Sequence, residues 1–238
     1  MVRLNKYIAD CGVCSRRAAD KLITCGLVSI NGKIVKELGI SVDETNDSVI
    51  VQGRKIEPVT RYRYIMLNKP KGCVCTVKDD KGRKTIFDYI DSKEHRLYPV
   101  GRLDYDTEGL ILLTNDGSLA YKLTHPSHDI PKTYIIKVEG TVPENDLATL
   151  RNGIELDGIK LHRAKIKLLE MENENKISRY EVTIYEGRNR QVRRMFESIG
   201  KEVVFLKRTA VGDLKLGGLG RGASRYLTPK EIDLLKKY

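Results

Sequence analysis

The chain has 238 residues, of which 40% are hydrophobic and 32% charged, and its net charge is +11. These proportions indicate a soluble globular protein of one large or two unequal domains. They exclude a membrane-spanning helix, because the longest apolar stretch, Gly109–Leu113, is too short to cross a bilayer. Polar residues at Arg3, Asn5 and Lys6 leave no apolar core for a secretory signal, so we expect a cytoplasmic protein. The five cysteines are an odd number and are expected to be reduced.

Residues 1–57 predict a small domain of two helices packed on a sheet. Apolar side chains recur at helical spacing over Leu4–Cys11, and Ser15 is placed to cap a second helix. An Asn31-Gly32 turn between apolar runs is typical of a tight hairpin, and a short strand follows at Ser48–Val51. Such a unit buries too little surface to carry out chemistry alone.

A linker at 58–63 separates this domain from a larger one at 64–238. Apolar alternation dominates the larger domain and helical patterns interrupt it, so we expect an α+β fold with a mostly antiparallel sheet. The expected strands are Tyr64–Leu67, Leu110–Thr114, Thr133–Val138, Ile159–Leu169 and Tyr180–Tyr185. The expected helices are Ser118–Thr124, Glu144–Asn152, Arg190–Ile199 and a last one that Thr228 caps.

Basic residues concentrate at two places along the chain. Residues 1–36 hold seven Lys or Arg against two acids, and residues 187–225 hold ten against three. Two basic regions on an otherwise neutral chain indicate a polyanion held at two points, although a solubilising surface is the alternative. In the first region, basic side chains gather around the start of the second helix, where free amides also favour phosphate. The candidate RNA-binding residues there are Lys6, Arg16, Arg17 and Lys21.

The densest cluster of candidate catalytic groups is Gly101–Gly109, in which Asp104, Asp106 and Glu108 alternate. One reading is a magnesium site built from the three carboxylates. No other acid cluster or His-bearing motif stands out to complete such a centre. A second reading is a solvated loop. In the third, Asp104 alone is a nucleophile, controlled by Arg102 and by a cation from elsewhere in the chain.

Two further patterns carry polar chemistry. Glu186–Met195 places four arginines in seven residues, more than solubility requires, and arginine suits phosphates and carboxylates. This pattern fits a phosphate-gripping helix of a non-enzymatic RNA binder equally well. Lys132-Thr133-Tyr134 opens an expected strand. Tyr134 is either half-buried packing or a flat surface for a base drawn out of its stack.

These motifs resemble two known families. The run Gly12–Ala19 resembles the S4 RNA-binding domain, and the resemblance covers residues 1 to about 50. The larger domain is similar to the RsuA/RluB branch of pseudouridine synthases, and its motifs fall in the family's order. The matching segments are Tyr98–Asp104 with Asp106–Leu110, Lys132–Tyr134, Glu186–Phe196, Met66–Gly72 and Leu227–Pro229.

The resemblance implies an isomerase that converts a uridine of ribosomal RNA to pseudouridine. By that resemblance Asp104 is the nucleophile, Tyr134 stacks on the base and handles a proton, and Arg193 is the ion-pair partner of Asp104. The reaction is an isomerisation, so we expect no cofactor and no metal. Further RNA contacts are expected from Arg102, Arg188, Arg190 and Arg194.

Within the branch, Asn189–Arg194 and Gly217–Leu219 look most like the RluB group, which modifies large-subunit (23S) ribosomal RNA. The expected partner is therefore ribosomal RNA or a pre-ribosomal particle, bound by a monomer without a membrane. Two alternatives are kept: small-subunit (16S) ribosomal RNA as the substrate, and a non-catalytic ribosome-assembly factor that binds the same RNA.

Overall fold

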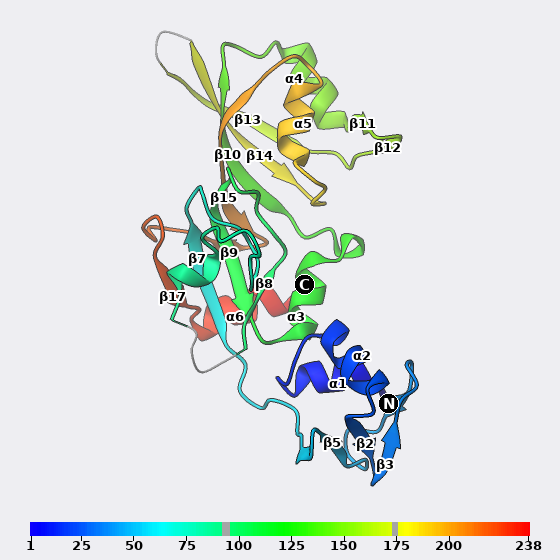
Figure 1. The fold of residues 1–238 in the computed structure, drawn as a ribbon. Coiled ribbons are helices and arrows are strands. Elements are labelled where there is room, and N and C mark those ends of the chain that lie inside the picture. Colours follow the sequence, from blue (N-terminus) through cyan, green and yellow to red (C-terminus); the bar gives the residue numbers. More distant parts are fainter. Residues whose placement is uncertain (92–95, 173–175) are drawn as a thin grey trace. The chain divides into compact units, whose positions relative to one another are not determined.

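The computed structural model describes residues 1–91, 96–172 and 176–238, and the chain divides into two compact units (Figure 1). Met1–Arg63 makes up most of the first unit, and most of the chain from Tyr64 onward makes up the second. Within the described residues, no helix combines the length and the apolar character that a bilayer crossing requires.

The first unit pairs two short helices, α1 (Leu4–Asp10) and α2 (Arg16–Thr24), with small sheets. The hydroxyl of Ser15 accepts a hydrogen bond from the backbone N–H of Ala18, so the predicted cap of α2 is confirmed. Gly12 has a φ of 76°, a left-handed conformation that suits the end of α1. The strands are β1 (Val2–Arg3), β2 (Val28–Ile30), β3 (Lys33–Val35), β4 (Ser41–Val42), β5 (Val49–Val51) and β6 (Arg54–Lys55), paired as β1-β4 and β3-β2-β5-β6.

The second unit is built on one large sheet, whose main path runs β13-β14-β10-β15-β9-β7-β17. Every described pairing in it is antiparallel except that of β15 with β9. The strands are β7 (Tyr64–Lys69), β8 (Tyr98–Val100), β9 (Glu108–Thr114), β10 (Lys132–Glu139), β13 (Lys165–Glu172), β14 (Ile177–Ile184), β15 (Val203–Val211), β16 (Leu214–Lys215) and β17 (Ser224–Tyr226). The helices are α3 (Gly117–Thr124), α4 (Glu144–Asn152), α5 (Gln191–Glu197) and α6 (Pro229–Lys236), with 3-10 turns η1 (Ile86–Tyr89) and η2 (Pro126–His128).

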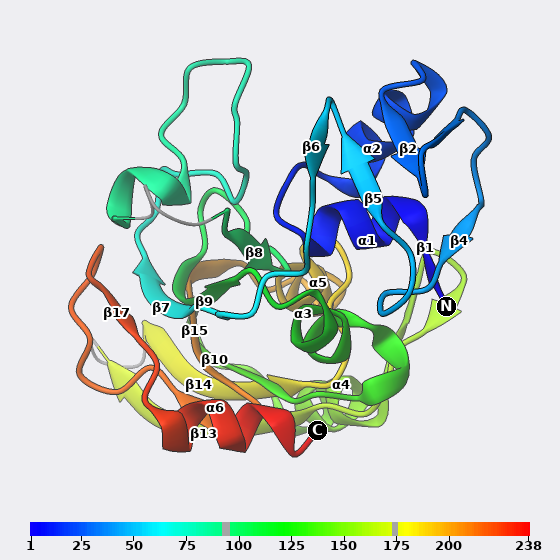
Figure 2. The same cartoon turned by 90° about the horizontal axis from the view of Figure 1, so that it is seen from below.

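Helices cover both faces of this sheet, as Figure 2 shows within the second unit. Successive side chains of a strand point to opposite faces, and β9 illustrates the division. Ile111 and Leu113 belong to the core under α4 and α5, whereas Leu110 and Leu112 belong to the core under α3 and α6. All residues of β9 are buried as a result. The predicted α+β fold with a mostly antiparallel sheet is confirmed.

Two strand predictions differ from the structure. Ile159–Leu169 was expected to be one strand, but it is divided between the β11–β12 hairpin (Glu155–Leu156 with Ile159–Lys160) and β13. The segment between them is tied to α4 instead, because Ala164 donates its N–H to the carbonyl of Arg151 at 3.1 Å. The sequence patterns also gave no strand at β15, although this strand lies in the middle of the sheet between β10 and β9.

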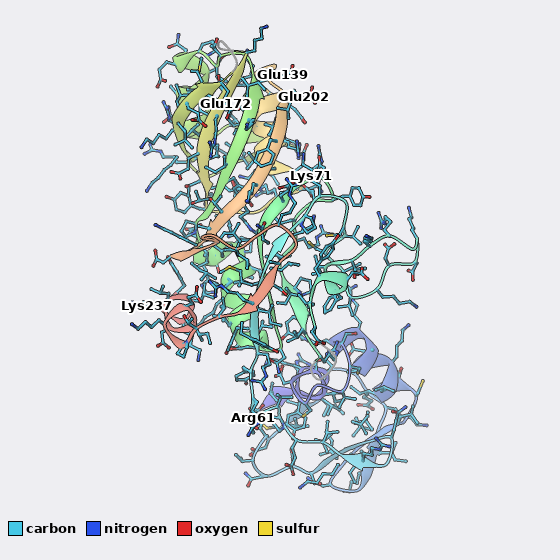
Figure 3. The ribbon with its side chains drawn as sticks, turned by 90° about the vertical axis from the view of Figure 1, so that its left-hand side faces the viewer. Arg61, Lys71, Glu139, Glu172, Glu202 and Lys237 are labelled. Carbon is cyan, nitrogen blue, oxygen red and sulfur yellow. The ribbon has the colours of Figure 1, made fainter. Side chains whose placement is uncertain are left out.

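Three glutamates mark the far end of the sheet. Glu139, Glu172 and Glu202 gather there in Figure 3, at the ends of β10 and β13 and just before β15. The opposite end of β10 starts with Lys132, next to the basic segments of the sequence. At the end with the glutamates, Lys137 pairs with Glu172 and Arg179 pairs with Glu170, so basic residues are present there too.

Candidate active site

A pocket of about 150 Å³ opens at the end of the sheet where β10 begins. It brings together Asp104 from the loop before β9, Tyr134 from β10 and the segment that precedes α5. Three of the predicted RNA-contacting arginines, Arg102, Arg188 and Arg190, also line it. Residues from three separate sequence motifs thus meet at one cavity, and Asp104 is half-buried within it.

Lys69, the last residue of β7, holds the Asp104 loop in place through hydrogen bonds. Its side chain is fully buried, and the ammonium donates to the carbonyls of Asp104 at 3.0 Å, Thr107 at 2.9 Å and Pro70 at 3.1 Å. Burial lowers the pKa of this ammonium. A tight turn, closed from the Thr107 N–H to the Asp104 carbonyl at 3.1 Å, completes the loop. The backbone that carries Asp104 is therefore fixed before any ligand arrives.

Arg193 does not pair with Asp104, and this prediction was wrong. Its guanidinium lies 3.0 Å from the carboxylate of Asp106 and also donates to the carbonyl of Val203. Arg193 is 7% exposed and is not among the residues that line the pocket. The reason is the turn in the loop, which directs Asp106 towards α5 and leaves Asp104 facing the cavity. No sequence pattern reports which of two alternate acids such a turn presents.

The three alternating acids therefore have separate surroundings. Asp106 pairs with Arg193 and, at 3.4 Å, with Arg190. Glu108 has a side chain only 3% exposed and lies 3.0 Å from the guanidinium of Arg221. Of the three, Asp104 alone lines the pocket. This arrangement favours the reading of Asp104 as a single nucleophile over the reading of three carboxylates around one ion.

A buried glutamate organises the third motif. Glu186 accepts hydrogen bonds from the Gln191 side chain at 3.1 Å, from the Arg188 guanidinium at 3.1 Å and from the His162 N–H at 2.9 Å. Arg190 has a φ of 48° immediately before α5 begins. This bend allows Arg188 and Arg190 to line the pocket. The sequence patterns did not identify Glu186 as a residue that shapes the site.

Arg194, the fourth arginine of this motif, turns away from the cavity. It forms a two-pronged ion pair with Asp157 of the β11–β12 hairpin, at 2.6 and 2.8 Å. The candidate RNA-binding residues of the first unit, Lys6, Arg16, Arg17 and Lys21, all carry exposed side chains, and Lys6 also pairs with Asp10 at 2.7 Å. Their contacts with RNA stay predictions.

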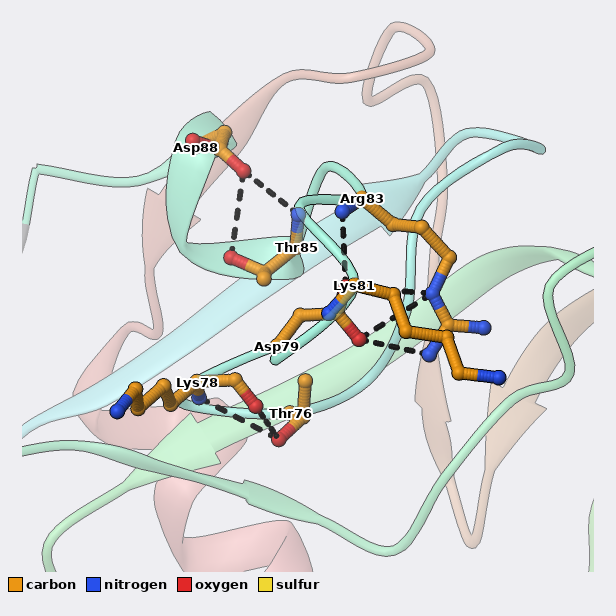
Figure 4. A network of polar contacts seen from close by, with 7 residues as sticks. All are labelled: Thr76, Lys78, Asp79, Lys81, Arg83, Thr85 and Asp88. Atoms are coloured by element: carbon orange, nitrogen blue, oxygen red, sulfur yellow. Dashed lines mark hydrogen bonds and ion pairs between the residues drawn. The ribbon is translucent and has the colours of Figure 1, made fainter.

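A wider groove of about 440 Å³ borders the other side of the Asp104 loop. One wall is the basic loop that carries Lys78, Lys81 and Arg83 (Figure 4). Asp79 braces this loop by accepting from the Arg83 guanidinium and from two backbone N–H groups, and these bonds lower the pKa of Asp79 to about 2. Four cations and three acids line the groove, so its net charge is only slightly positive.

Two cationic residues of the pocket were also missed. Lys132 begins β10, and burial together with the nearby Arg208 charge lowers its pKa to about 8. Arg208, from β15, is only 6% exposed. An apolar run from Val203 to Leu206 was the available signal for β15, but nothing in it marks Arg208 as a residue of a site.

A pocket that holds a carboxylate between basic walls, in a chain with a separate basic unit, fits an enzyme that acts on RNA. Comparison with known families agrees: residues 63–198 match the RNA pseudouridylate synthase family, and residues 2–49 match the S4 domain. The chain belongs to the RNA pseudouridylate synthase family and is an RNA pseudouridine synthase with an S4 domain.

Relatives match this chain over nearly their whole length. The chain is 49% identical to "Ribosomal large subunit pseudouridine synthase B" of Bacillus subtilis (strain 168), over 99% of this chain and 96% of that protein. It is 39% identical to "Ribosomal small subunit pseudouridine synthase A" of Haemophilus influenzae, over 99% of this chain and all of that one. A solved structure described as "Crystal structure of pseudouridylate synthase" matches with a TM-score of 0.71 and 37% identity, covering 99% of this chain and 100% of that one. The predicted resemblance is confirmed.

Proposed function

We propose that this enzyme converts a uridine of large-subunit ribosomal RNA to pseudouridine, with Asp104 as the nucleophile. The observation that carries the proposal is the position of Asp104. It is the one acid of its loop that lines the pocket, opposite Tyr134 and among arginines. The large-subunit substrate is supported by the higher identity to the B. subtilis relative than to the H. influenzae one.

The reaction breaks the N1–C1′ bond of uridine, turns the uracil and joins its C5 to C1′. Substrate and product are isomers, so an ionised carboxylate is sufficient to start it. Asp104 either attacks C1′ or removes a proton from C2′, and both routes need a charged oxygen close to the sugar. The Lys69 bonds position the Asp104 backbone for this task.

The target uridine must leave its stack to reach Asp104, which costs a few kcal/mol. Tyr134 is 8% exposed and lines the pocket, so its ring offers a surface for the base. Stacking on such a ring contributes about 1–3 kcal/mol and offsets part of the cost. Arg102, Arg188 and Arg190 carry exposed side chains and are suited to the flanking phosphates.

A tritium-release assay tests this proposal. Ribosomal RNA transcripts labelled at C5 of uridine lose tritium to water when pseudouridine forms. We expect release with the wild-type protein, none above background with Asp104→Asn, and reduced but measurable release with Asp106→Asn. The second variant is the matched control, because Asp106 lies in the same loop but does not itself line the pocket. Full activity of Asp104→Asn would overturn the assignment.

The substrate is tested with the same assay on large- and small-subunit transcripts. Release from the large-subunit transcript alone supports the proposed substrate, whereas release from the small-subunit transcript alone refutes it. If naked transcripts are inert, pre-ribosomal particles of each subunit replace them. RNA binding without release from any of these substrates would favour the assembly-factor alternative.

A further inference from the structure

Arg208 is a buried cation without an anionic partner. Among the described residues, two arginines are buried, Arg193 and Arg208. Arg193 pairs with Asp106, but Arg208 forms no ion pair with a carboxylate in residues 1–91, 96–172 or 176–238. Its one side-chain hydrogen bond runs from Nε to the carbonyl of Leu110 at 2.8 Å. An unpaired buried charge is costly, so its presence at this position points to an anion that arrives with a ligand.

The strand register of the sheet places the Arg208 guanidinium at the pocket. In β15, Arg208 is the register partner of Tyr134 on one side and of Gly109 on the other. It therefore sits between the strand that carries the stacking residue and the strand that follows the Asp104 loop. Arg208 lines the same pocket as Asp104 and Tyr134. With Nε held by Leu110, the two terminal nitrogens have no hydrogen-bond partner among the described residues and remain available to a ligand.

The depth of Arg208 indicates which part of an RNA it meets. The exposed arginines at the pocket are Arg102, Arg188 and Arg190, and these are the residues that backbone phosphates reach first. A phosphate that reached an arginine only 6% exposed would have to carry two sugars into the pocket with it. A flipped uracil is flat and presents carbonyl oxygens at its edge. The base is therefore the group that fits beside Arg208.

We propose that Arg208 is a catalytic residue that stabilises the negative charge of the departing uracil. This proposal rests on the proposed function of the enzyme. When the N1–C1′ bond breaks, its electron pair leaves with the uracil, which becomes an anion with charge on N1 and its two carbonyl oxygens. Asp104 stabilises the sugar that is left, either by bonding to C1′ or by taking the C2′ proton. Bonding of C5 to C1′ then neutralises the base, and it either expels the Asp104 oxygen from C1′ or proceeds with return of the proton from Asp104 to C2′. The C5 proton leaves to water and N1 gains a proton, which completes pseudouridine.

Lys132 adds a second positive charge to the same pocket. It lines the pocket at the start of β10, two residues before Tyr134, and its ammonium donates to the Tyr185 carbonyl at 3.3 Å. The low pKa of Lys132, about 8, arises from burial and then from the Arg208 charge, so the two cations are close enough to repel each other. A negative ligand between them relieves that repulsion. The pocket is thus arranged for an anion that exists only during the reaction.

The test compares Arg208→Gln, Arg208→Lys and the control Lys207→Gln. Lys207 precedes Arg208 in β15, its side chain points to the opposite face of the sheet, and it does not line the pocket. With saturating RNA in single-turnover tritium release, Arg208→Gln should slow the reaction by about 10²–10³-fold, as loss of a preorganised donor to a developing anion does. RNA affinity should change little, Arg208→Lys should be faster than Arg208→Gln, and Lys207→Gln should match the wild type.

A rescue experiment separates charge from structure. Arg208→Ala removes the guanidinium, and millimolar guanidinium chloride should restore part of its turnover when compared with an equal concentration of sodium chloride. The Lys207→Ala protein should show no such gain. An Arg208→Gln protein with the wild-type rate overturns the proposal. So does one whose RNA affinity falls as much as its rate, because that result places the charge on a bound phosphate. If the wild type itself releases no tritium, the proposed function fails first.

Discussion

Replacement of Lys69 by methionine tests how much the Asp104 loop depends on one buried charge. Methionine keeps most of the length and apolar volume of the lysine side chain but removes the ammonium. That ammonium serves three carbonyls at 2.9–3.1 Å, two of which belong to the loop that carries Asp104. The substitution therefore leaves three acceptors without their donor inside a fully buried site.

Two opposing contributions set the expected change in the free energy of unfolding: the lost hydrogen bonds and the relieved burial of the ammonium. A hydrogen bond to a charged group stabilises by about 1.5–3 kcal/mol, so three of them contribute roughly 5–9 kcal/mol. Burial of the ammonium costs several kcal/mol, and the methionine variant no longer has this cost. We expect the free energy of unfolding to fall by about 2–4 kcal/mol. Turnover at saturating RNA should also fall, by up to about 100-fold, because a loosened loop misplaces Asp104.

Urea titration followed by far-ultraviolet circular dichroism measures the first effect, since the chain has no tryptophan for fluorescence. Lys122→Met, at an exposed position of α3, is the control and should change the free energy of unfolding by less than about 0.5 kcal/mol. An unchanged unfolding free energy for Lys69→Met, or a gain, would refute the reasoning that these three bonds outweigh the burial of the charge.

Three more predictions follow from the sheet and the pocket. Lys132 is a cation below its pKa of about 8 and neutral above it, so turnover should decline as pH rises through 8; Asp129 and Glu186 oppose the lowering by burial and Arg208. In Lys132→Arg, which stays charged, that decline should disappear from the pH–rate profile. Gly109→Ala should lower the free energy of unfolding by roughly 2–5 kcal/mol, because φ is +106° and the new Cβ would lie 2.1 Å from the Arg208 carbonyl oxygen. Gly200→Ala, with a similarly positive φ but open space, should cost only about 1–2 kcal/mol in a parallel urea titration. Deletion of residues 1–57 should weaken binding to structured RNA, measured by filter binding, more than it slows single-turnover chemistry at saturation; unchanged affinity would contradict the expected role of the S4 domain.

Residues whose chemistry is local could be predicted from the sequence. Ser15 caps α2 through a neighbour three residues away. The resemblance of short motifs singled out Asp104 and Tyr134, and both line the pocket, while their roles stay predictions. The α+β class followed from the alternation of apolar residues, which every strand repeats over a few positions. These features depend on side chains close together in the chain.

Residues whose role depends on distant pairing could not be predicted. In the sequence, Lys69 is an ordinary end of an apolar strand, and the turn at Asp104 and Thr107 supplies two of its three acceptors. Arg208 reaches the pocket because β15 lies between β10 and β9, a position that the alternation within β15 does not encode. The partner of Arg193 was misplaced for the same reason, since the loop turn decides which acid faces α5.

The insertion of β15 between β10 and β9 also sets when the enzyme can first act during its synthesis. The Asp104 loop and Tyr134 are made early, but the strand that joins their halves of the sheet is completed only at Val211. Until then, β9 and β10 each present an edge without its final neighbour, and such edges are prone to wrong pairing. Pairing of strands that lie this far apart in the sequence is also slow. A ribosome-bound chain that ends before β15 would therefore carry a complete S4 sequence but no closed pocket.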